Sequence, residues 1–166
     1  MPPSHWHLIA ESIAQQRRLS LIDCARLFAL IGIAQADASV VCWETKFHSN
    51  TWRPVTAIQR AAEDRNPLTQ ADTAWEQLLP SPQFPSYISG HSIFSQSSAE
   101  VLTQFLGTDE VKFTTTSDSV PGVLRTFESL AACADELDPN YDNSMSSGWS
   151  KTHQLPDEEH SSILPA

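Results

Sequence analysis

Cysteine and glycine are both scarce in this chain of 166 residues, which holds three of the first and five of the second. The cysteines, Cys24, Cys42 and Cys133, are odd in number and form no CxxC pair, so the sequence indicates neither a disulfide framework nor a zinc site. Buried, unpaired thiols are expected instead. The shortage of glycine also argues against a collagen-like chain or a flexible linker.

Basic residues are few as well. Lysine and arginine number 10 against 20 aspartates and glutamates, which gives a net charge of −10. Phosphate backbones and anionic membranes bind basic surfaces, so the sequence predicts no nucleic-acid partner. Any site for an anion must therefore be local and depend on a few well-placed cations.

Long hydrophobic runs are missing. The longest, residues 27–34, is far too short to span a bilayer. The first residues lack a basic region followed by an apolar run, so no signal peptide is visible. The sequence predicts a soluble chain without a membrane span, cytoplasmic by default.

What the sequence does contain is a series of helix patterns. Serines stand where helices should begin, at Ser4, Ser20 and Ser89, and Gly107 stands where the last of these should end. Helical spacing of apolar residues follows each start, and strand patterns are almost absent. The expected helices are residues 4–18, 21–47, 54–66, 73–79, 89–107 and 124–137, with a short extended piece at 114–119.

The long second helix should carry one buried stripe, and the chain as a whole should form an all-α domain. Apolar residues keep helical spacing along the second helix. They are Leu27, Ile31, Ala34, Ala38 and Val41. Residues 1–137 are expected to form one helical domain, and the polar residues 138–166 a divergent, disordered tail.

Two groups of residues could bind an anion. The first places Lys46 near the end of one helix and Arg53 before Pro54 at the start of the next. Taken alone, Lys46 could simply stabilise the carbonyl end of its helix, and Arg53 could be an ordinary surface residue.

The second group is Ser89-Gly90-His91 at a helix start. Free backbone N–H groups and the serine hydroxyl can cradle an anion there, and Gly90 lets it approach the backbone. His91 can carry a proton near neutral pH. The simpler alternative is that Ser89 is only an N-cap and His91 a partly exposed first-turn residue.

Together, the two groups resemble a known superfamily. The order K-x6-R-P, then S-G-H, resembles the first two motifs of the vanadium-dependent haloperoxidases and type-2 phosphatidic acid phosphatases. The residues at 51–58, 84–85 and 105–109 resemble the soluble, bacterial haloperoxidase-like branch, and the resemblance runs from His5 to Glu136. It implies part of the helical bundle of the haloperoxidase and acid phosphatase type.

The resemblance also implies roles and partners. Lys46 and Arg53 would neutralise the oxygens of bound vanadate, Ser89 and the Gly90 amide would donate hydrogen bonds to it, and His91 would act as acid and base. The implied cofactor is vanadate, with hydrogen peroxide and halide as substrates. In the phosphatase alternative, the substrate is a small phosphate ester. Family members are often dimers, which makes a homodimer an expectation too.

The resemblance ends at the family's third motif, Arg-x-x-x-Gly-x-His, whose histidine binds vanadium or attacks phosphorus. No arginine follows Arg125, and neither His153 nor His160 has the glycine at the required spacing. The sequence predicts a truncated, frameshifted or divergent copy whose activity is in doubt. Three interpretations remain open: a haloperoxidase-like enzyme, an acid phosphatase of the same superfamily, and an inactive remnant or interaction module.

Overall fold

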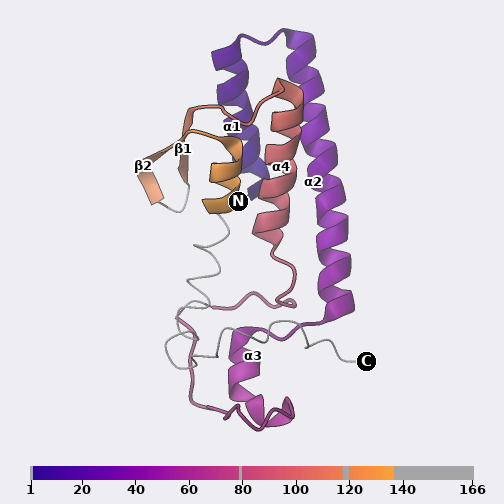
Figure 1. The fold of residues 1–166 in the computed structure, drawn as a ribbon, viewed down its shortest axis with the longest axis vertical. Coiled ribbons are helices and arrows are strands. Elements are labelled where there is room, and N and C mark those ends of the chain that lie inside the picture. Colours follow the sequence, from indigo (N-terminus) through magenta and orange to yellow (C-terminus); the bar gives the residue numbers. More distant parts are fainter. Residues whose placement is uncertain (1, 79, 118–119, 137–166) are drawn as a thin grey trace. The chain divides into compact units, whose positions relative to one another are not determined.

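The fold was analysed in a computed structural model that describes residues 2–78, 80–117 and 120–136 (Figure 1). These residues divide into two units. One holds the chain up to Trp52 and from Gln83 onward, and the other holds Arg53–Pro82. The expected tail at 138–166, with His153 and His160, lies outside the described residues.

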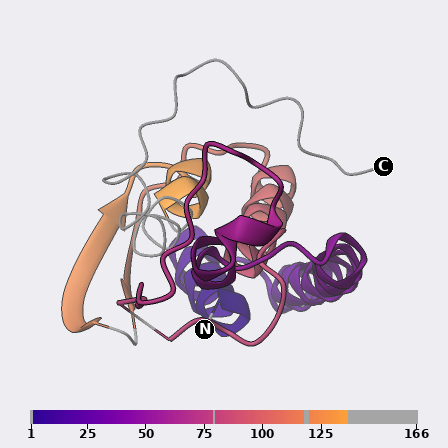
Figure 2. The ribbon, with the colours of Figure 1, turned by 90° about the horizontal axis from the view of Figure 1, so that it is seen from below.

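The first unit is built on three helices that pack side by side (Figures 1 and 2). They are α1 (Pro2–Arg17), α2 (Leu21–Ser49) and α4 (Gly90–Leu106). A hairpin of β1 (Phe113–Ser117) and β2 (Val120–Phe127) packs against α1, and residues 130–136 are helical. The prediction of a mostly helical bundle is confirmed.

The second unit is smaller. It contains α3 (Pro54–Gln59) and a 3-10 turn, η1 (Ala61–Glu63). The predicted helix over 54–66 is therefore too long, because Asp64 and Asn66 form tight side-chain turns that replace helical hydrogen bonds. The predicted helix over 73–79 is wrong in the residues described, where Asp72 closes a single turn through the N–H of Ala74.

One core lies between the three helices, the hairpin and residues 130–136. The apolar residues predicted for the first helix, Trp6, Ile9, Ile13 and Ala14, are all buried. α2, α4, β1 and residues 130–136 contribute to the same cluster, and Phe127 of β2 packs against it. The remaining core residues are Ala10, Leu27, Ile31, Ala99, Leu102, Val111, Phe113, Leu130, Cys133 and Ala134.

Three predicted helix boundaries are confirmed by their hydrogen bonds. The Ser20 hydroxyl accepts the N–H of Asp23 at 3.1 Å, and the Ser89 hydroxyl accepts the N–H of Ser92 at 3.3 Å. Gly107 ends α4 in the left-handed region, with φ of 73°, where a side chain would add strain. Local caps thus set the start of α2 and both ends of α4.

The predicted helix over 124–137 is wrong in its first part, because residues 120–127 form a strand. Phe113 pairs with Phe127, and their rings lie 5.7 Å apart. The helix begins only at residue 130, where Asp109 accepts the N–H groups of Leu130 and Ala131. Packing of the two rings across the strands therefore favours a hairpin. The cap from Asp109 places the start of the helix at residue 130, after the second strand.

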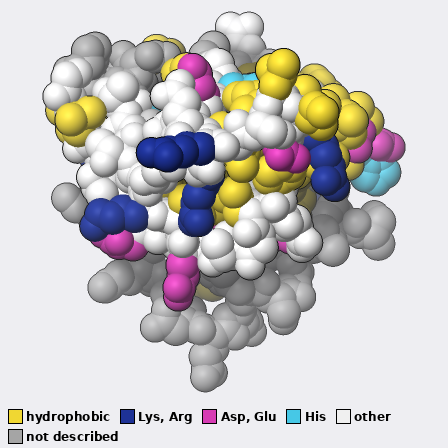
Figure 3. Space-filling model, turned by 90° about the horizontal axis from the view of Figure 1, so that it is seen from above, with side chains coloured by type: hydrophobic (Ala, Val, Ile, Leu, Met, Phe, Trp, Pro, Cys, Tyr) yellow, Lys and Arg dark blue, Asp and Glu magenta, His cyan; other side chains and the backbone are white. Residues whose placement is uncertain are grey.

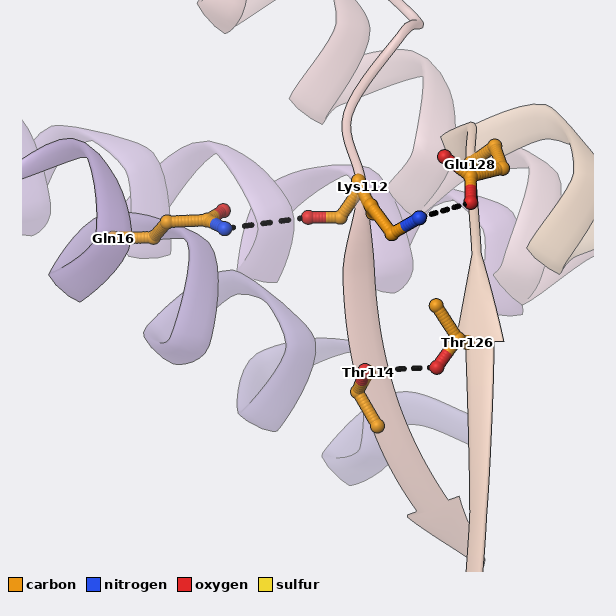
Figure 4. Close-up of polar contacts among 5 residues, drawn as sticks. All are labelled: Gln16, Lys112, Thr114, Thr126 and Glu128. Atoms are coloured by element: carbon orange, nitrogen blue, oxygen red, sulfur yellow. Dashed lines mark hydrogen bonds and ion pairs between the residues drawn. The ribbon is translucent and has the colours of Figure 1, made fainter.

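Polar contacts tie the hairpin together and to α1 (Figure 4). The Gln16 amide donates to the Lys112 carbonyl at 3.4 Å. Lys112 pairs with Glu128 beside the strands, and the hydroxyls of Thr114 and Thr126 lie 3.0 Å apart. The threonine-rich segment that was predicted only as extended is thus one half of a paired sheet.

The buried face of α2 differs from the predicted stripe at its second half. Val41 is 52% exposed, and its neighbour Cys42 is buried. Polar residues share the buried face, whose members are Leu27, Ile31, Gln35, Ala38, Cys42 and Lys46. Because Gln35 and Lys46 are polar, a search for apolar spacing could not place them on the inner face.

One helical stretch, within Leu21–Gln59, is long and apolar enough to cross a membrane by length and composition alone. The prediction drawn from uninterrupted apolar runs missed it, since charged residues interrupt the stretch. Its α2 part packs one face against α1 and α4, and 22% of the apolar window is buried. A single stretch of this kind is weak evidence for a membrane span and is compatible with a soluble protein.

The core makes a direct prediction about stability. Leu102→Ala, at a side chain that is 0% exposed, should lower the free energy of unfolding by about 2–5 kcal/mol because it leaves a cavity. Leu124→Ala, at a side chain that is 71% exposed, is the matched control and should change it by less than about 0.5 kcal/mol. Urea unfolding followed by circular dichroism measures both, and equal effects would contradict this core.

Candidate functional site

The first turn of α4 presents hydrogen-bond donors at its start. Ser89 is the N-cap, with an extended backbone, and its carbonyl accepts the N–H of Ile93 at 3.2 Å. The first N–H groups of any helix have no carbonyl partner within the helix itself, and Gly90 and His91 stand at these positions. This end of α4 therefore offers amides and a hydroxyl to a negatively charged group.

Lys46 is held at the end of α2. Its side chain is 2% exposed, and its Nζ donates to the carbonyls of Pro85 and Ser86 at 3.0 and 3.1 Å. The same Nζ lies 5.0 Å from the centre of the Phe84 ring. These contacts join the end of α2 to the segment that leads into α4, and they place a positive charge in a largely dry environment.

Cys42 connects Lys46 to the first turn of α4. A Cβ placed on Gly90 would lie 3.8 Å from the Cys42 sulfur, and Cys42 stands one helical turn before Lys46. Burial raises the pKa of Cys42, although the nearby Lys46 charge acts in the opposite direction. The thiol is therefore neutral at pH 7 and adds no negative charge that would compete for Lys46.

His91 is half-buried in the first turn of α4. Burial lowers the pKa of His91 below its ordinary value of 6.5. A neutral imidazole is consequently the main form at pH 7, and it can accept a proton. This chemistry suits a group that holds a proton for a reaction at the α4 terminus.

Arg53 belongs to the second unit. It is the N-cap residue of α3, with extended backbone angles of −71° and 152° before Pro54. Lys46, Ser89, Gly90 and His91 all lie in the first unit, and the structure does not place Arg53 relative to them. Among the described residues, no three histidines, cysteines, aspartates or glutamates come together as a metal site.

A buried polar contact between α2 and α4 escaped the sequence analysis. The Gln35 amide donates to the Ser98 hydroxyl at 3.0 Å, and that hydroxyl donates to the Phe94 carbonyl at 2.7 Å. Ser95 and Ser98 are both 0% exposed. Small residues at helical spacing, Ser95, Ser98 and Ala99, were the available sign that this face of α4 packs closely.

Comparison with known proteins decides the family. A model of the second helical-bundle domain of vanadium chloroperoxidase, abbreviated VCPO, matches residues 26–161. The chain belongs to this family. The residues that carry Lys46 and the Ser89-Gly90-His91 turn lie inside the match, and so does Arg53.

Two relatives support the relationship to vanadium haloperoxidases. The vanadium chloroperoxidase of Curvularia inaequalis is 35% identical over 82 residues, which are 43% of this chain and 13% of that protein. The crystal structure of the first bacterial vanadium-dependent iodoperoxidase superimposes with a TM-score of 0.71 and 31% identity, over 85% of this chain and 32% of that chain. The chain thus spans about a third or less of either relative.

Lys46 should stabilise the fold as well as the site. Lys46→Met keeps a long apolar stem but leaves the Pro85 and Ser86 carbonyls without this donor, which should cost about 1–3 kcal/mol in the free energy of unfolding. Lys112→Met is the control, because the Lys112 side chain is 66% exposed. Urea unfolding tests both, and a Lys46→Met variant as stable as the wild type would contradict the role of these bonds.

His91 should make stability depend on pH. Its pKa is lower in the folded chain than in the unfolded chain, so the unfolded chain binds more protons between the two values. Stability should therefore fall as pH drops through about 6.5, and it should stop falling below the folded pKa. His91→Gln should lose less stability than the wild type between pH 8 and pH 5, measured by urea unfolding.

A direct titration checks the same prediction. The His91 ring signal in NMR spectra should shift at a lower pH in the folded chain than in the chain unfolded with urea. The exposed His48→Gln variant controls for removal of an imidazole as such. A His91 signal that titrates at or above its value in the unfolded chain would overturn the argument from burial.

Proposed function

We propose that the chain binds vanadate at the first turn of α4, as the oxyanion site of a haloperoxidase-like protein. One observation carries the proposal. The buried ammonium of Lys46 donates to the Pro85 and Ser86 carbonyls, in the segment that leads into Ser89 and the start of α4. A buried cation near the N-terminus of a helix favours a compact oxyanion over a neutral ligand.

The residues fit such a group by their chemistry. Lys46 supplies charge, and the Ser89 hydroxyl and Gly90 amide supply hydrogen bonds. Gly90 has no side chain to obstruct the approach of an oxygen, and the neutral Cys42 beside it brings no repulsion. Arg53 is proposed as a further donor, because its planar guanidinium suits two oxygens at once.

The proposed reaction is the peroxide-dependent oxidation of halide. Bound vanadate would supply the centre at which hydrogen peroxide is reduced to water while halide is oxidised to a hypohalous acid, with uptake of a proton. His91 would accept that proton from solvent and pass it on, because its half-buried imidazole is neutral at pH 7 and can take a proton up. The partners proposed are hydrogen peroxide, a halide and a second copy of the chain, and the proposed location is the cytoplasm.

Binding and turnover are separate parts of the proposal. The sequence after Glu136 has no Arg-x-x-x-Gly-x-His run, so the histidine of the third motif is missing from its expected place. Binding rests on the residues of the first two motifs. Turnover requires that another group take the place of the missing histidine. A chain in which no group replaces this histidine would bind vanadate and have no activity.

Calorimetric titration with orthovanadate tests the binding. Lys46→Ala and His91→Ala should each weaken binding about tenfold or more, since a charge-assisted hydrogen bond contributes about 1.5–3 kcal/mol. Lys112→Ala and His48→Ala remove an exposed residue of the same kind and should leave binding unchanged. A folded, helical wild type that shows no binding would refute the proposal.

Activity assays then separate the reactions. Halide oxidation by hydrogen peroxide that requires added vanadate would support the haloperoxidase. Hydrolysis of a phenyl phosphate ester, inhibited by vanadate, would instead indicate the acid phosphatase chemistry of the superfamily. Vanadate binding with neither activity would identify a family member that keeps the site and has lost its reaction.

A further inference from the structure

Three consecutive residues contact the buried ammonium of Lys46. The centre of the Phe84 ring lies 5.0 Å from Nζ, and the carbonyls of Pro85 and Ser86 accept hydrogen bonds from Nζ at 3.0 and 3.1 Å. Ser86 in turn donates its backbone N–H to the carbonyl of Thr51, just beyond the end of α2, at 3.0 Å. The segment that contacts the ammonium is therefore anchored to the same end of α2 from which Lys46 comes.

Lys46 is more enclosed than the cations at the other end of the first unit. Lysine and arginine side chains lie on the surface at the end where α2 begins (Figure 3). Lys46, in the last turn of α2, is 2% exposed. A lysine carries its charge on a flexible stem of four carbons, so its ammonium keeps one position only where neighbouring groups hold it.

The Phe84 ring is itself held by a second aromatic side chain. Trp43 meets it in a T-shaped contact, with ring centres 5.0 Å apart and an interplanar angle of 77°. Trp43 and Lys46 are three residues apart on α2, so their side chains are neighbours on the helix surface. The Phe84 ring thus contacts two neighbouring side chains of α2, and the perpendicular contact with Trp43 opposes rotation of the ring.

These side chains form a row that runs from the surface to the ammonium. Phe47 stacks on Trp43, with ring centres 6.1 Å apart. The exposed fraction falls from 64% for Phe47 to 41% for Trp43, and Phe84 is half-buried. Phe84 is the member of this row whose ring contacts the charge of Lys46.

We infer that Phe84 is a positioning residue, whose ring fixes the Lys46 ammonium and is itself held by Trp43. The face of a benzene ring is negative and its edge is positive. An ammonium over that face is attracted to it, and the attraction grows where water is excluded, as it is around Lys46. A leucine would fill much of the same space without this attraction, so the role depends on the electrons of the ring.

The consequence for anion binding rests on the proposed function. An ammonium that already has a fixed position loses less freedom when it contacts an oxyanion, so Phe84 should strengthen vanadate binding through Lys46. The contact between the ring and the ammonium does not itself depend on vanadate. The position of the ammonium and its effect on the anion can therefore be measured separately.

Nitrogen NMR of the Lys46 ammonium tests the positioning directly. Hydrogen bonds and burial slow the exchange of ammonium protons with water, so the wild type should give a resolved signal that Lys46→Met removes. Phe84→Leu should speed this exchange at least about fivefold, whereas Phe84→Tyr keeps the ring face and should stay within about twofold of the wild type. A wild type without a resolved Lys46 signal would show that the ammonium is not held.

Phe105→Leu is the matched control for the loss of a ring that faces a cation. The Phe105 ring lies 5.8 Å from the Arg26 guanidinium, and Phe105 stands at the opposite end of α4 from Ser89. Its removal should leave the exchange of the Lys46 ammonium protons unchanged. An equal effect of Phe105→Leu and Phe84→Leu would trace the change to general loosening of the fold and contradict the inference.

Pentafluorophenylalanine in place of Phe84 separates the charge distribution of the ring from its size. Fluorination makes the ring face positive while the ring keeps its shape, so the ammonium protons should exchange at least as fast as in Phe84→Leu. Trp43→Leu should cause a smaller increase, because the ring remains and loses only its support. Circular dichroism checks that each variant is folded, and if Phe84→Leu is not, the tyrosine and pentafluoro variants decide. A pentafluoro variant that exchanges like the wild type overturns the inference.

Calorimetric titration with orthovanadate then distinguishes this inference from the proposed function. Phe84→Leu and the pentafluoro variant should bind vanadate about threefold to tenfold more weakly, and Phe84→Tyr and Phe105→Leu should bind it as the wild type does. A wild type that binds no vanadate refutes the vanadate site, and the exchange rates still decide the role of Phe84. A wild type that binds, with the same affinity in every Phe84 variant, refutes the effect of Phe84 and leaves the vanadate site standing.

Discussion

The packing of α2 against α4 is the constraint on which the rest of this structure depends. The inner face of α2 changes along its length, from apolar residues at Leu27 and Ile31 to the polar Gln35 and the charged Lys46. The first part closes the core with α1 and the hairpin, and the last part approaches the start of α4. One helix thus supplies both the stability of the bundle and the cation of the site, so damage to the packing damages both.

The burial of Lys46 links the fold to the proposed chemistry. A buried ammonium is costly unless it is hydrogen-bonded, and the carbonyls of Pro85 and Ser86 together with the Phe84 ring compensate for part of that cost. The same dry surroundings strengthen its attraction for an anion. Burial of His91 lowers the pKa of its imidazole and so favours the neutral form. The proposed chemistry therefore assigns the two groups distinct tasks, charge to Lys46 and proton transfer to His91.

Those helix boundaries that depend on hydrogen bonds within a single turn could be predicted from the sequence. The caps at Ser20, Ser89 and Gly107 each depend on one or two hydrogen bonds within a turn, and all three are confirmed. The hairpin was missed because it depends on Phe113 meeting Phe127 and on Asp109 capping a helix far along the chain. The inner face of α2 was only partly predicted, because Gln35 is buried through its bond to Ser98 and not through apolarity. Motif order predicted four candidate site residues that lie in the first unit, whereas no local rule could place Arg53 relative to them.

The Gln35 to Ser98 hydrogen bond has a consequence for how this fold can vary. An amide buried between two helices finds its partner in one axial alignment, and a slide by one turn would leave it unbonded. The alignment of α2 with α4 is thus determined inside the first unit, and the length of the connection through Arg53–Pro82 does not determine it. That connection can be lengthened, shortened or exchanged while the Lys46 end of α2 stays opposite the start of α4. Diversity among related proteins should therefore concentrate in this connection, which can change without altering the packing of α2 against α4.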